Sequence, residues 1–309
     1  MEKTWAERGA LYYDWALALL PDNIGRIKNR EKMKFAVHQA NHIGARRYNQ
    51  DRVGYAYTND ALLLVLADGM GGHLHGEIAA EIAVLTFMRA FGRLKEGRVK
   101  EPEVFLRETM RAGHDAIFDY AREQQLGGNP GTTCVTALVQ DGHIWWAHAG
   151  DSRCYLLRGD AVVEVTHDHS VVQQWADWGI ISADEMKTHP DRNKITNCLG
   201  GVEDMFYVDV SQPNAVQAGD TLLLCSDGFW SPLTDVEMAK LSSVPALPEK
   251  LDELIRLAVF REAARADNTT AVVARLGVAD VRAFGLAWED CESLLGQLGY
   301  AARVDVVET

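Results

Sequence analysis

The feature that most constrains this chain is an uninterrupted apolar run, ALLLVLA at residues 61–67, which stops at Asp68-Gly69. A run this short, ended by a turn-forming pair, is typical of a β-strand buried on both faces. A second run, TLLLC at residues 221–225, leads through one serine into another Asp-Gly pair. The repeated pattern predicts that two strands deliver aspartates to one place.

Helical and extended patterns fill most of the remaining chain. Apolar residues at helical spacing predict helices over residues 77–93, 103–125, 171–178, 234–241 and 248–266, and a helical tail over 287–298. Strand patterns occur at 35–40, 205–210 and 270–276, and residues 132–165 predict an antiparallel meander with a hairpin turn at Asp141-Gly142.

No linker-like run and no repeat of fixed period divides the chain, so one main domain is favoured over two. We assign residues 33–280 to that domain. Residues 1–32 carry a helical pattern followed by a basic run and are expected to form an N-terminal extension, and residues 281–309 a C-terminal helical tail.

Charge and cysteine content exclude several classes of function. The net charge of −13, from 44 acidic and 31 basic residues, opposes nucleic-acid binding. The five cysteines are odd in number and form no C-x-x-C pair, which argues against a disulfide framework and a structural zinc site and favours a reducing cytoplasm. No apolar stretch is long enough and free enough of charge to span a membrane.

Five aspartates stand at the edge of an apolar strand or in a loop beside one: Asp51, Asp68, Asp151, Asp227 and Asp267. A single Asp-Gly is usually a turn, because aspartate oxygens bond to turn backbone groups. Hard divalent cations, however, prefer oxygen ligands, and a site for two cations needs several converging carboxylates. Five such aspartates in one setting therefore favour a metal centre over five separate turns.

Six motifs in order strengthen this interpretation: R-x-x-N-Q-D, D-G-M-G-G-H, G-T-T, G-D-S-R, S-D-G-x-W and D-N-T-T. Each motif alone is weak. Their order and spacing, over roughly residues 35–276, resemble the PPM family of serine/threonine phosphatases, the protein phosphatase 2C type, in its bacterial form.

The resemblance implies an α+β fold, a four-layer α-β-β-α sandwich with two antiparallel sheets, and a metal centre at one end of the sheets. It implies that Asp68 bridges two Mn²⁺ or Mg²⁺ ions, that Gly69 offers its carbonyl, and that Asp227 and Asp267 complete the pair. Asp51 would contribute directly or through water. Asp151 would hold a third, weaker metal together with Asp227.

The implied activity is hydrolysis of phosphoserine and phosphothreonine in proteins, by a metal-bridging hydroxide and without a covalent enzyme intermediate. Asp68 and Asp227 would be central to the chemistry. Arg46 matches the phosphate-binding arginine of the family, with Arg47 as its local rival. The implied partners are phosphorylated proteins, targets of a serine/threonine kinase, and we expect a monomer.

Two positions depart from the family pattern. Gln50 stands where glutamate is usual, which removes a charge beside Asp51, and Met70 stands where the eukaryotic form has a histidine proposed as general acid. His73 and His75 lie nearby, although loop histidines are more often structural.

Residues 166–170, THDHS, begin a stretch that extends to Gly200 and resembles the flap beside the active site of bacterial members. Within it, Asp168 has two readings, a contact to the third metal or a turn residue. The tryptophans at 145, 146, 175, 178 and 230 are assigned to packing.

Two other functions compete with this interpretation. A catalytically inactive signalling module would keep the fold but lose metal ligands, and all five aspartates are present. A hydrolase of another phosphate ester would share the metal centre, because the metals select phosphorus chemistry and not the leaving group.

Overall fold

The computed structural model describes residues 33–70, 75–94, 97–202, 206–277 and 304–306. The chain divides into two units, residues 1–32 and 33–309, and only the second contains described residues. The predicted N-terminal extension, His73 and the predicted helix at 287–298 lie outside the described residues. Within the tail, Val304–Val306 form a short strand, β14.

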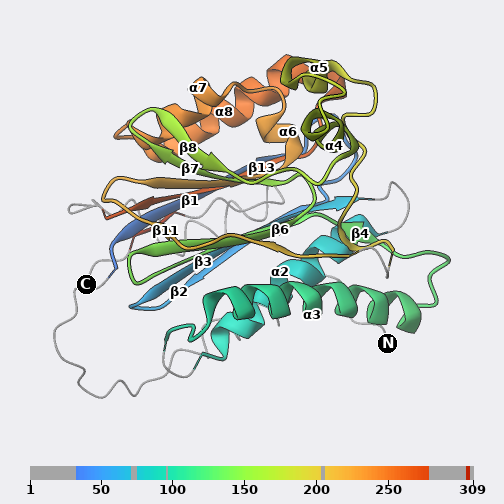
Figure 1. The fold of residues 1–309 in the computed structure, drawn as a ribbon, viewed down its shortest axis with the longest axis horizontal. Helices are drawn as coiled ribbons and strands as arrows, with labels where there is room; N and C mark the ends of the chain where they lie inside the picture. The colour runs from blue at the N-terminus through green and yellow to red at the C-terminus, as the bar shows by residue number, and fades with distance from the viewer. Residues whose placement is uncertain (1–32, 71–74, 95–96, 203–205, 278–303, 307–309) are drawn as a thin grey trace, which may run out of the picture. The chain divides into compact units, whose positions relative to one another are not determined.

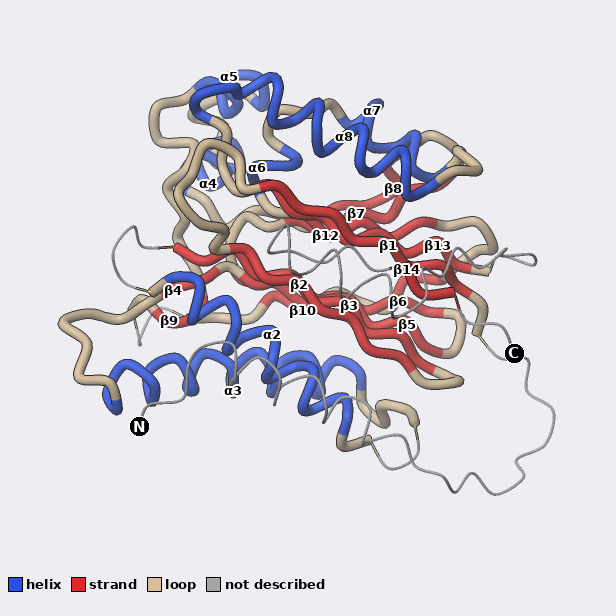
Figure 2. Tube along the Cα trace, turned by 180° about the vertical axis from the view of Figure 1, so that it is seen from behind, coloured by secondary structure: helices blue, strands red, loops and turns tan. Residues whose placement is uncertain are grey.

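The described residues form four layers, two sheets face to face between two layers of helices (Figure 1). Helices α2 (Gly76–Gly92) and α3 (Pro102–Glu123) cover one sheet, and α7 (Asp235–Ala239) and α8 (Leu247–Glu262) cover the other (Figure 2). Every strand pairing is antiparallel among the described residues. The predicted α+β sandwich is confirmed.

The first sheet has eight strands among the described residues, in the order β10-β6-β5-β3-β4-β9, with β11 beside β6 and β2 beside β3. Its strands are β2 (Asp51–Tyr57), β3 (Ala61–Met70), β4 (Gly131–Thr132), β5 (Cys134–Gln140), β6 (His143–Ala149), β9 (Leu199–Gly200), β10 (Asp209–Val210) and β11 (Asn214–Ala215).

The second sheet has six strands in the described residues, in the order β14-β1-β13-β12-β7-β8. Its other strands are β1 (Phe35–His42), β7 (Arg153–Arg158), β8 (Ala161–Val165), β12 (Thr221–Cys225) and β13 (Thr269–Leu276). Three further helices, α4 (Val171–Asp177), α5 (Ala183–Thr188) and α6 (Asp227–Trp230), lie in the connections after β8 and β12.

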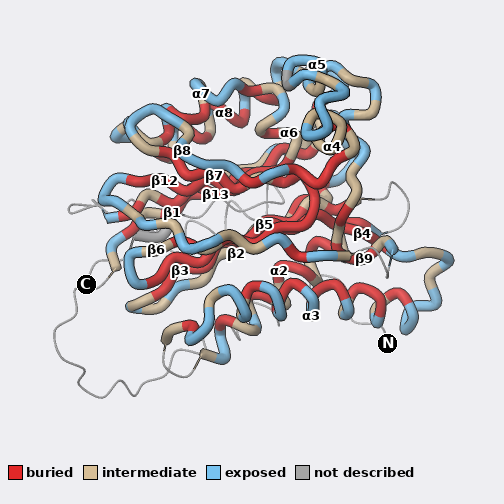
Figure 3. The backbone as a smooth tube through the Cα atoms, in the orientation of Figure 1, coloured by how far each residue is buried: buried red, intermediate tan, exposed pale blue. Residues whose placement is uncertain are grey.

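The apolar run of β3 is continuous because each of its faces is covered. Leu62, Leu64 and Leu66 face the second sheet, where they pack with Leu224 and Val272. The alternate residues of the same strand pack in the core beneath α2 and α3. Side chains of a strand point alternately to opposite faces, so one run contributes to two cores. Figure 3 shows the inner faces of the helices and the strands buried and the outer helix faces exposed.

Three predictions about strands are wrong in detail. Strand β3 does not stop at residue 67 but continues to Met70, because Gly69 pairs with Thr132 of β4. The predicted meander over 132–165 is split between the sheets, with β5 and β6 in the first and β7 and β8 in the second. Strand β2 has no counterpart among the predicted strands, because its sequence DRVGYAY has weak alternation and it is mostly half-exposed.

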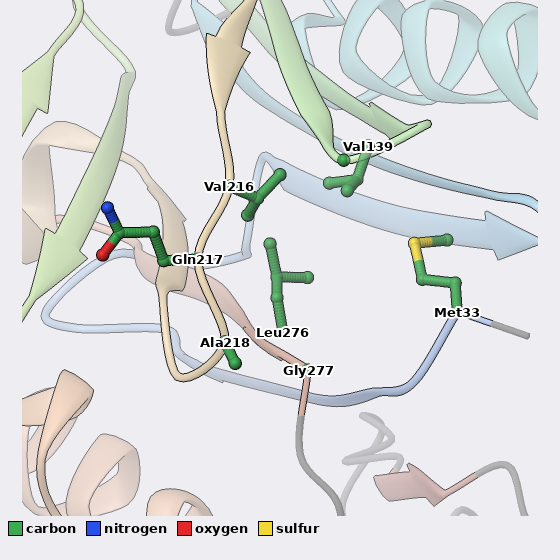
Figure 4. A pocket seen from close by; sticks show the side chains of 8 residues that line it. Met33, Val139, Val216, Gln217, Ala218, Leu276 and Gly277 are labelled. Carbon is green, nitrogen blue, oxygen red and sulfur yellow. The ribbon is translucent and has the colours of Figure 1, made fainter. Parts of the chain in front are cut away.

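A small apolar cavity of about 190 Å³ lies between the sheets, lined by Met33, Val139, Val216 and Leu276 among others (Figure 4). Leu276 ends β13, whose first residue follows the predicted metal ligand Asp267 by two positions. Seven steps of about 3.3 Å separate the two ends of that strand. The cavity therefore lies at the opposite end of the sandwich from the aspartates.

Candidate metal centre

The five aspartates meet because strand ends from both sheets come together. In the second sheet, Cys225 at the end of β12 pairs with Arg153 at the start of β7 and with Ala271 near the start of β13. Residues just before β7, just after β12 and just before β13 therefore share one edge. Asp151, Asp227 and Asp267 occupy those three positions.

The first sheet contributes the other two aspartates from adjacent strands. Asp51 at the start of β2 is the register partner of Asp68 in β3. The Ser226 hydroxyl, at the end of β12, donates a hydrogen bond of 2.9 Å to Oδ2 of Asp51. This buried bond joins the two sheets at the place where their aspartates face each other.

Burial, and after it the charge of neighbouring carboxylates, raises the pKa values of four of these aspartates. Burial raises the pKa of Asp68 well above its usual value, and the negative charges of the other four aspartates raise it further. Burial is also the main cause that raises the pKa of Asp227, followed by the charge of Asp151. Burial raises the pKa of Asp51 to about 6 and that of Asp151 to about 7. The ionised cluster is therefore unfavourable unless positive charge is added.

The donor set fits hard divalent cations. Oδ1 of Asp51 and Oδ1 of Asp227 are buried and have no hydrogen-bond partner among the described residues. An unpaired buried carboxylate oxygen is costly. A cluster made only of carboxylate and carbonyl oxygens is the ligand chemistry that Mg²⁺ and Mn²⁺ prefer. The predicted ligands are thus brought together in an environment suited to such ions.

Gly69 is required by packing. A side chain at this position would place its first carbon 2.3 Å from the carbonyl oxygen of Gly76, at the start of α2. The Gly69 amide donates to the Gln50 carbonyl at 3.3 Å. The absence of a side chain lets β3, α2 and the loop before β2 converge beside Asp68.

Arg46 lies at the rim of the cluster. Its side chain is 57% exposed, and its Nη2 lies 2.6 Å from Oδ2 of Asp267. Arg47 is exposed and forms no ion pair within the described part of the chain. Of the two rival arginines, Arg46 is the one in contact with the aspartate cluster.

Asn268 has a positioning role that the sequence interpretation missed. Its Oδ1 accepts a 2.9 Å hydrogen bond from the Gln50 amide, and its Nδ2 donates to the carbonyl oxygens of Ile43 and Tyr48. One side chain thus holds both ends of the loop that carries Arg46. The D-N-T-T motif contained the signal, but only the pairing of distant segments gives it this meaning.

A second network, of hydrogen bonds and a cation–π contact, supports Asp151. The Trp230 indole N–H donates a 2.9 Å hydrogen bond to the Asp151 carbonyl, and the Arg153 guanidinium lies 3.4 Å from the centre of the Trp230 ring. Arg153 also forms two bonds, of 2.8 and 2.7 Å, to Asp168. In the structure Asp168 forms an ion pair with Arg153, and a contact of Asp168 with a third metal stays a prediction.

The assignment of all five tryptophans to packing is wrong in part. Trp178 is 69% exposed, and Trp230 adds a hydrogen bond to its packing.

We expect Trp230→Phe to weaken the support of Asp151. The substitution keeps an aromatic ring facing Arg153 but removes the indole donor, which should cost about 1 kcal/mol of stability and about 2–4 °C in Tm. Thermal unfolding would be measured with and without Mn²⁺. Trp178→Phe, at an exposed position, is the matched control, and equal behaviour of the two variants would contradict the prediction.

His75 and Gln50 lie at the start of α2. The side-chain amide of Gln50 lies 3.4 Å from Oε2 of Glu77, so a carboxylate of α2 stands beside the position where the family usually has an acid. His75 caps the same helix in a left-handed conformation, with φ of 62°, and its Nδ1 lies 3.8 Å from Glu77.

Helices α4 and α5 belong to the predicted flap. They lie at the same end of the sandwich as β4 in both views (Figures 1 and 2). Ser170 pairs with Ile195, and the Thr196 amide donates to the His169 carbonyl at 2.8 Å, so the two ends of the flap are joined at its base.

Among the described residues, no helix is both long and apolar enough to cross a membrane.

Comparison with known proteins identifies the family. A sequence model of protein phosphatase 2C matches residues 38–259. The serine/threonine phosphatase stp of Listeria innocua is 36% identical over 216 residues, which cover 68% of this chain and 84% of that protein. The crystal structure of the serine/threonine phosphatase PstP/Ppp of Mycobacterium tuberculosis superposes with a TM-score of 0.70 at 31% identity, over 79% of this chain and 100% of that one.

A structure of the PstP catalytic domain in complex with 2 manganese ions has a TM-score of 0.67 at 29% identity, over 79% of this chain and 99% of that one. The family model covers more than half of the chain, and the fold agrees with the solved structures of the relatives. The chain therefore belongs to the protein phosphatase 2C family.

Proposed function

We propose that this protein phosphatase removes phosphate from phosphoserine and phosphothreonine of proteins, at a centre of two divalent cations held by Asp51, Asp68, the Gly69 carbonyl, Asp227 and Asp267. Asp151 and Asp227 would hold a third, weaker ion. When bound, the cations supply an activated water for in-line attack on phosphorus and neutralise the phosphate oxygens, so no covalent enzyme intermediate is needed.

The observation that carries this proposal is the convergence of the five aspartates at the neighbouring strand ends of the two sheets. The pKa of Asp68 is raised first by burial and then by all four of the others. Carboxylates gathered this closely, with two buried oxygens unpaired, favour binding of several positive charges. The relatives named above are serine/threonine phosphatases, which supports the substrate class.

The side chains have separate tasks in this proposal. The aspartates hold the ions, while Ser226 and Asn268 fix the sheet edge and the loop that present them. Arg46 binds phosphate oxygens with its planar guanidinium group, a geometry that suits two oxygens at once. Its 2.6 Å contact with Asp267 supports this role, and binding of a phosphate requires the arginine to exchange that partner.

Metal removal tests the proposed centre directly. We expect hydrolysis of a phosphothreonine peptide and of p-nitrophenyl phosphate to stop in EDTA and to return when Mn²⁺ or Mg²⁺ is added. Dialysis against buffer without EDTA is the control for handling. Full activity of the protein in EDTA would rule out the proposed chemistry, whereas hydrolysis of p-nitrophenyl phosphate without any hydrolysis of phosphopeptides would rule out the substrate class.

Replacement of Arg46 tests phosphate binding. Hydrogen bonds to a charged group contribute about 1.5–3 kcal/mol, so Arg46→Ala should raise KM for the phosphopeptide by about 10- to 100-fold. Arg47→Ala is the matched control, since this neighbour is equally charged and makes no ion pair within the described residues. A larger increase in KM for Arg47→Ala than for Arg46→Ala would assign the role to Arg47.

A further inference from the structure

A second cluster of possible metal ligands lies at the base of the flap, apart from the aspartate centre. It consists of His148 in β6, His169 at the start of the flap, and Asp209 in β10. One potential ligand atom from each residue lies within 4.8 Å of the other two. His148 and Asp209 are register partners on neighbouring strands, so the sheet itself sets their separation.

His148 is oriented by its backbone contact. Its Nε2 lies 2.8 Å from the carbonyl oxygen of His167, which can only accept, so the ring proton is on Nε2. Nδ1 therefore carries a free lone pair. That nitrogen is buried and has no hydrogen-bond partner among the described residues, and the residue is only 4% exposed. A histidine held in this way by its second nitrogen is typical of metal ligands.

His169 presents its other nitrogen to the same space. Its Nδ1 faces the side-chain amide of Asn197 at 2.9 Å and accepts a 3.3 Å hydrogen bond from the Gly150 amide. The ring stacks on His148 with 4.3 Å between centroids. Its Nε2 is buried and unpaired in the described part of the chain, 3.6 Å from Oδ2 of Asp209. His169 is 5% exposed, so this nitrogen is also withdrawn from bulk water.

We propose that His148 Nδ1, His169 Nε2 and a carboxylate oxygen of Asp209 form a binding site for a divalent metal of the zinc type, with water as a further ligand. Two imidazoles and one carboxylate are ligands that Zn²⁺ accepts readily, whereas the aspartate centre offers only oxygens. The side chain of Asp209 is 61% exposed, so ions can reach the site from solvent.

Binding of the ion requires the hydrogen bonds around His169 and Asn197 to rearrange. Because Asn197 donates to Nδ1 of His169, the ring proton is on Nε2 without the ion and moves to Nδ1 when the ion binds. The Asn197 amide then has to turn its oxygen toward the ring, so its 2.8 Å bond to the Tyr207 carbonyl and its 3.3 Å bond from the Tyr207 amide are lost. The Gly150 amide loses its acceptor on His169 as well. This cost makes the site weaker than one whose second nitrogen already donates.

An ion here would fasten the flap to the sheet. His169 follows Asp168, the partner of Arg153, and His148 precedes Asp151 by three positions. The site would therefore connect β6, which ends just before Asp151, to the start of the flap, whose Asp168 supports Asp151 through Arg153. Zinc binding should slow hydrogen exchange of backbone amides at residues 166–170 and 195–197.

The test uses the full chain with the aspartate centre disabled by Asp68→Asn and Asp227→Asn. After treatment with EDTA and its removal, Zn²⁺ is titrated calorimetrically. We expect one zinc ion per chain to bind to this parent, and at least tenfold weaker binding after Asp209→Asn or His148→Gln. Asp184→Asn, on the flap, and His143→Gln, on the same strand as His148, are matched controls and should bind zinc like the parent.

Asp209→Asn is the decisive variant, because its side chain is exposed and its loss should not prevent folding. Zinc binding that is equal in Asp209→Asn and its parent would overturn the proposal and indicate that an ordinary water molecule links the three groups. X-ray absorption at the zinc edge gives an independent result. Scattering from two imidazoles supports the site, and its absence contradicts it.

Discussion

Replacing Asp68 or Asp227 with asparagine is expected to lower kcat/KM for a phosphothreonine peptide by more than about 100-fold. Loss of an outer partner of a metal ligand typically costs about 10- to 100-fold in affinity or activity, and both aspartates are proposed to bind metal directly. Asparagine keeps the size of the side chain, so the effect isolates the charge. Steady-state kinetics at saturating Mn²⁺ would measure it.

Asp160→Asn is the control for that experiment. Asp160 belongs to the turn between β7 and β8 and has a positive φ of 62°, a conformation that asparagine also adopts readily. This variant should retain the activity of the unmodified protein. If Asp68→Asn and Asp227→Asn remain as active as Asp160→Asn, the aspartate cluster is not the catalytic centre.

The same cluster should make the metal-free protein less stable as the pH rises. Burial raises the pKa of Asp51 from 3.8 to about 6 and that of Asp151 from 3.8 to about 7. The folded state therefore binds protons more tightly than the unfolded state. The resulting stability is fully present below pH ~4, the usual aspartate value, and is lost as the pH rises through 6 and 7.

One unit of pKa corresponds to about 1.4 kcal/mol, or about 3–6 °C in Tm for a domain of this size. Thermal unfolding in EDTA between pH 5 and 8 should show the decline, and Mn²⁺ should remove most of it by neutralising the cluster. Asp68→Asn and Asp227→Asn should raise the Tm of the metal-free protein at pH 8 while abolishing activity. A Tm in EDTA that stays constant or rises between pH 5 and 8 would contradict this account.

The sequence predicted most of the fold because its buried strands carry strong local signals. The runs at 61–67 and 221–225 became β3 and β12, and the hairpin turn at Asp141-Gly142 connects β5 and β6. The change of sheet after β6 was missed, since hairpin signals are local and do not specify which sheet the next strand joins. Strand β2 was missed because a half-exposed edge strand lacks a clear apolar period.

The aspartates of the candidate site were predictable from the sequence, but the residues that support them were not. The motifs named Asp51, Asp68 and the other aspartates, and the structure brings them together. The roles of Ser226 and Asn268 depend on contacts across 175 and 218 residues of sequence. A serine or an asparagine beside an aspartate carries no signal of such a contact, since these residues are common in turns.

The aspartates belong to two different sheets, and that division has a mechanical consequence. Leucines between the sheets hold the two sheets together, while the like charges of the aspartates repel each other across the gap between the sheets. Ions bound between the carboxylates would hold the two sheets together at this edge. Substituting an interior residue such as Leu64 would then alter affinity for metal from a distance, because it changes the gap across which the carboxylates must reach.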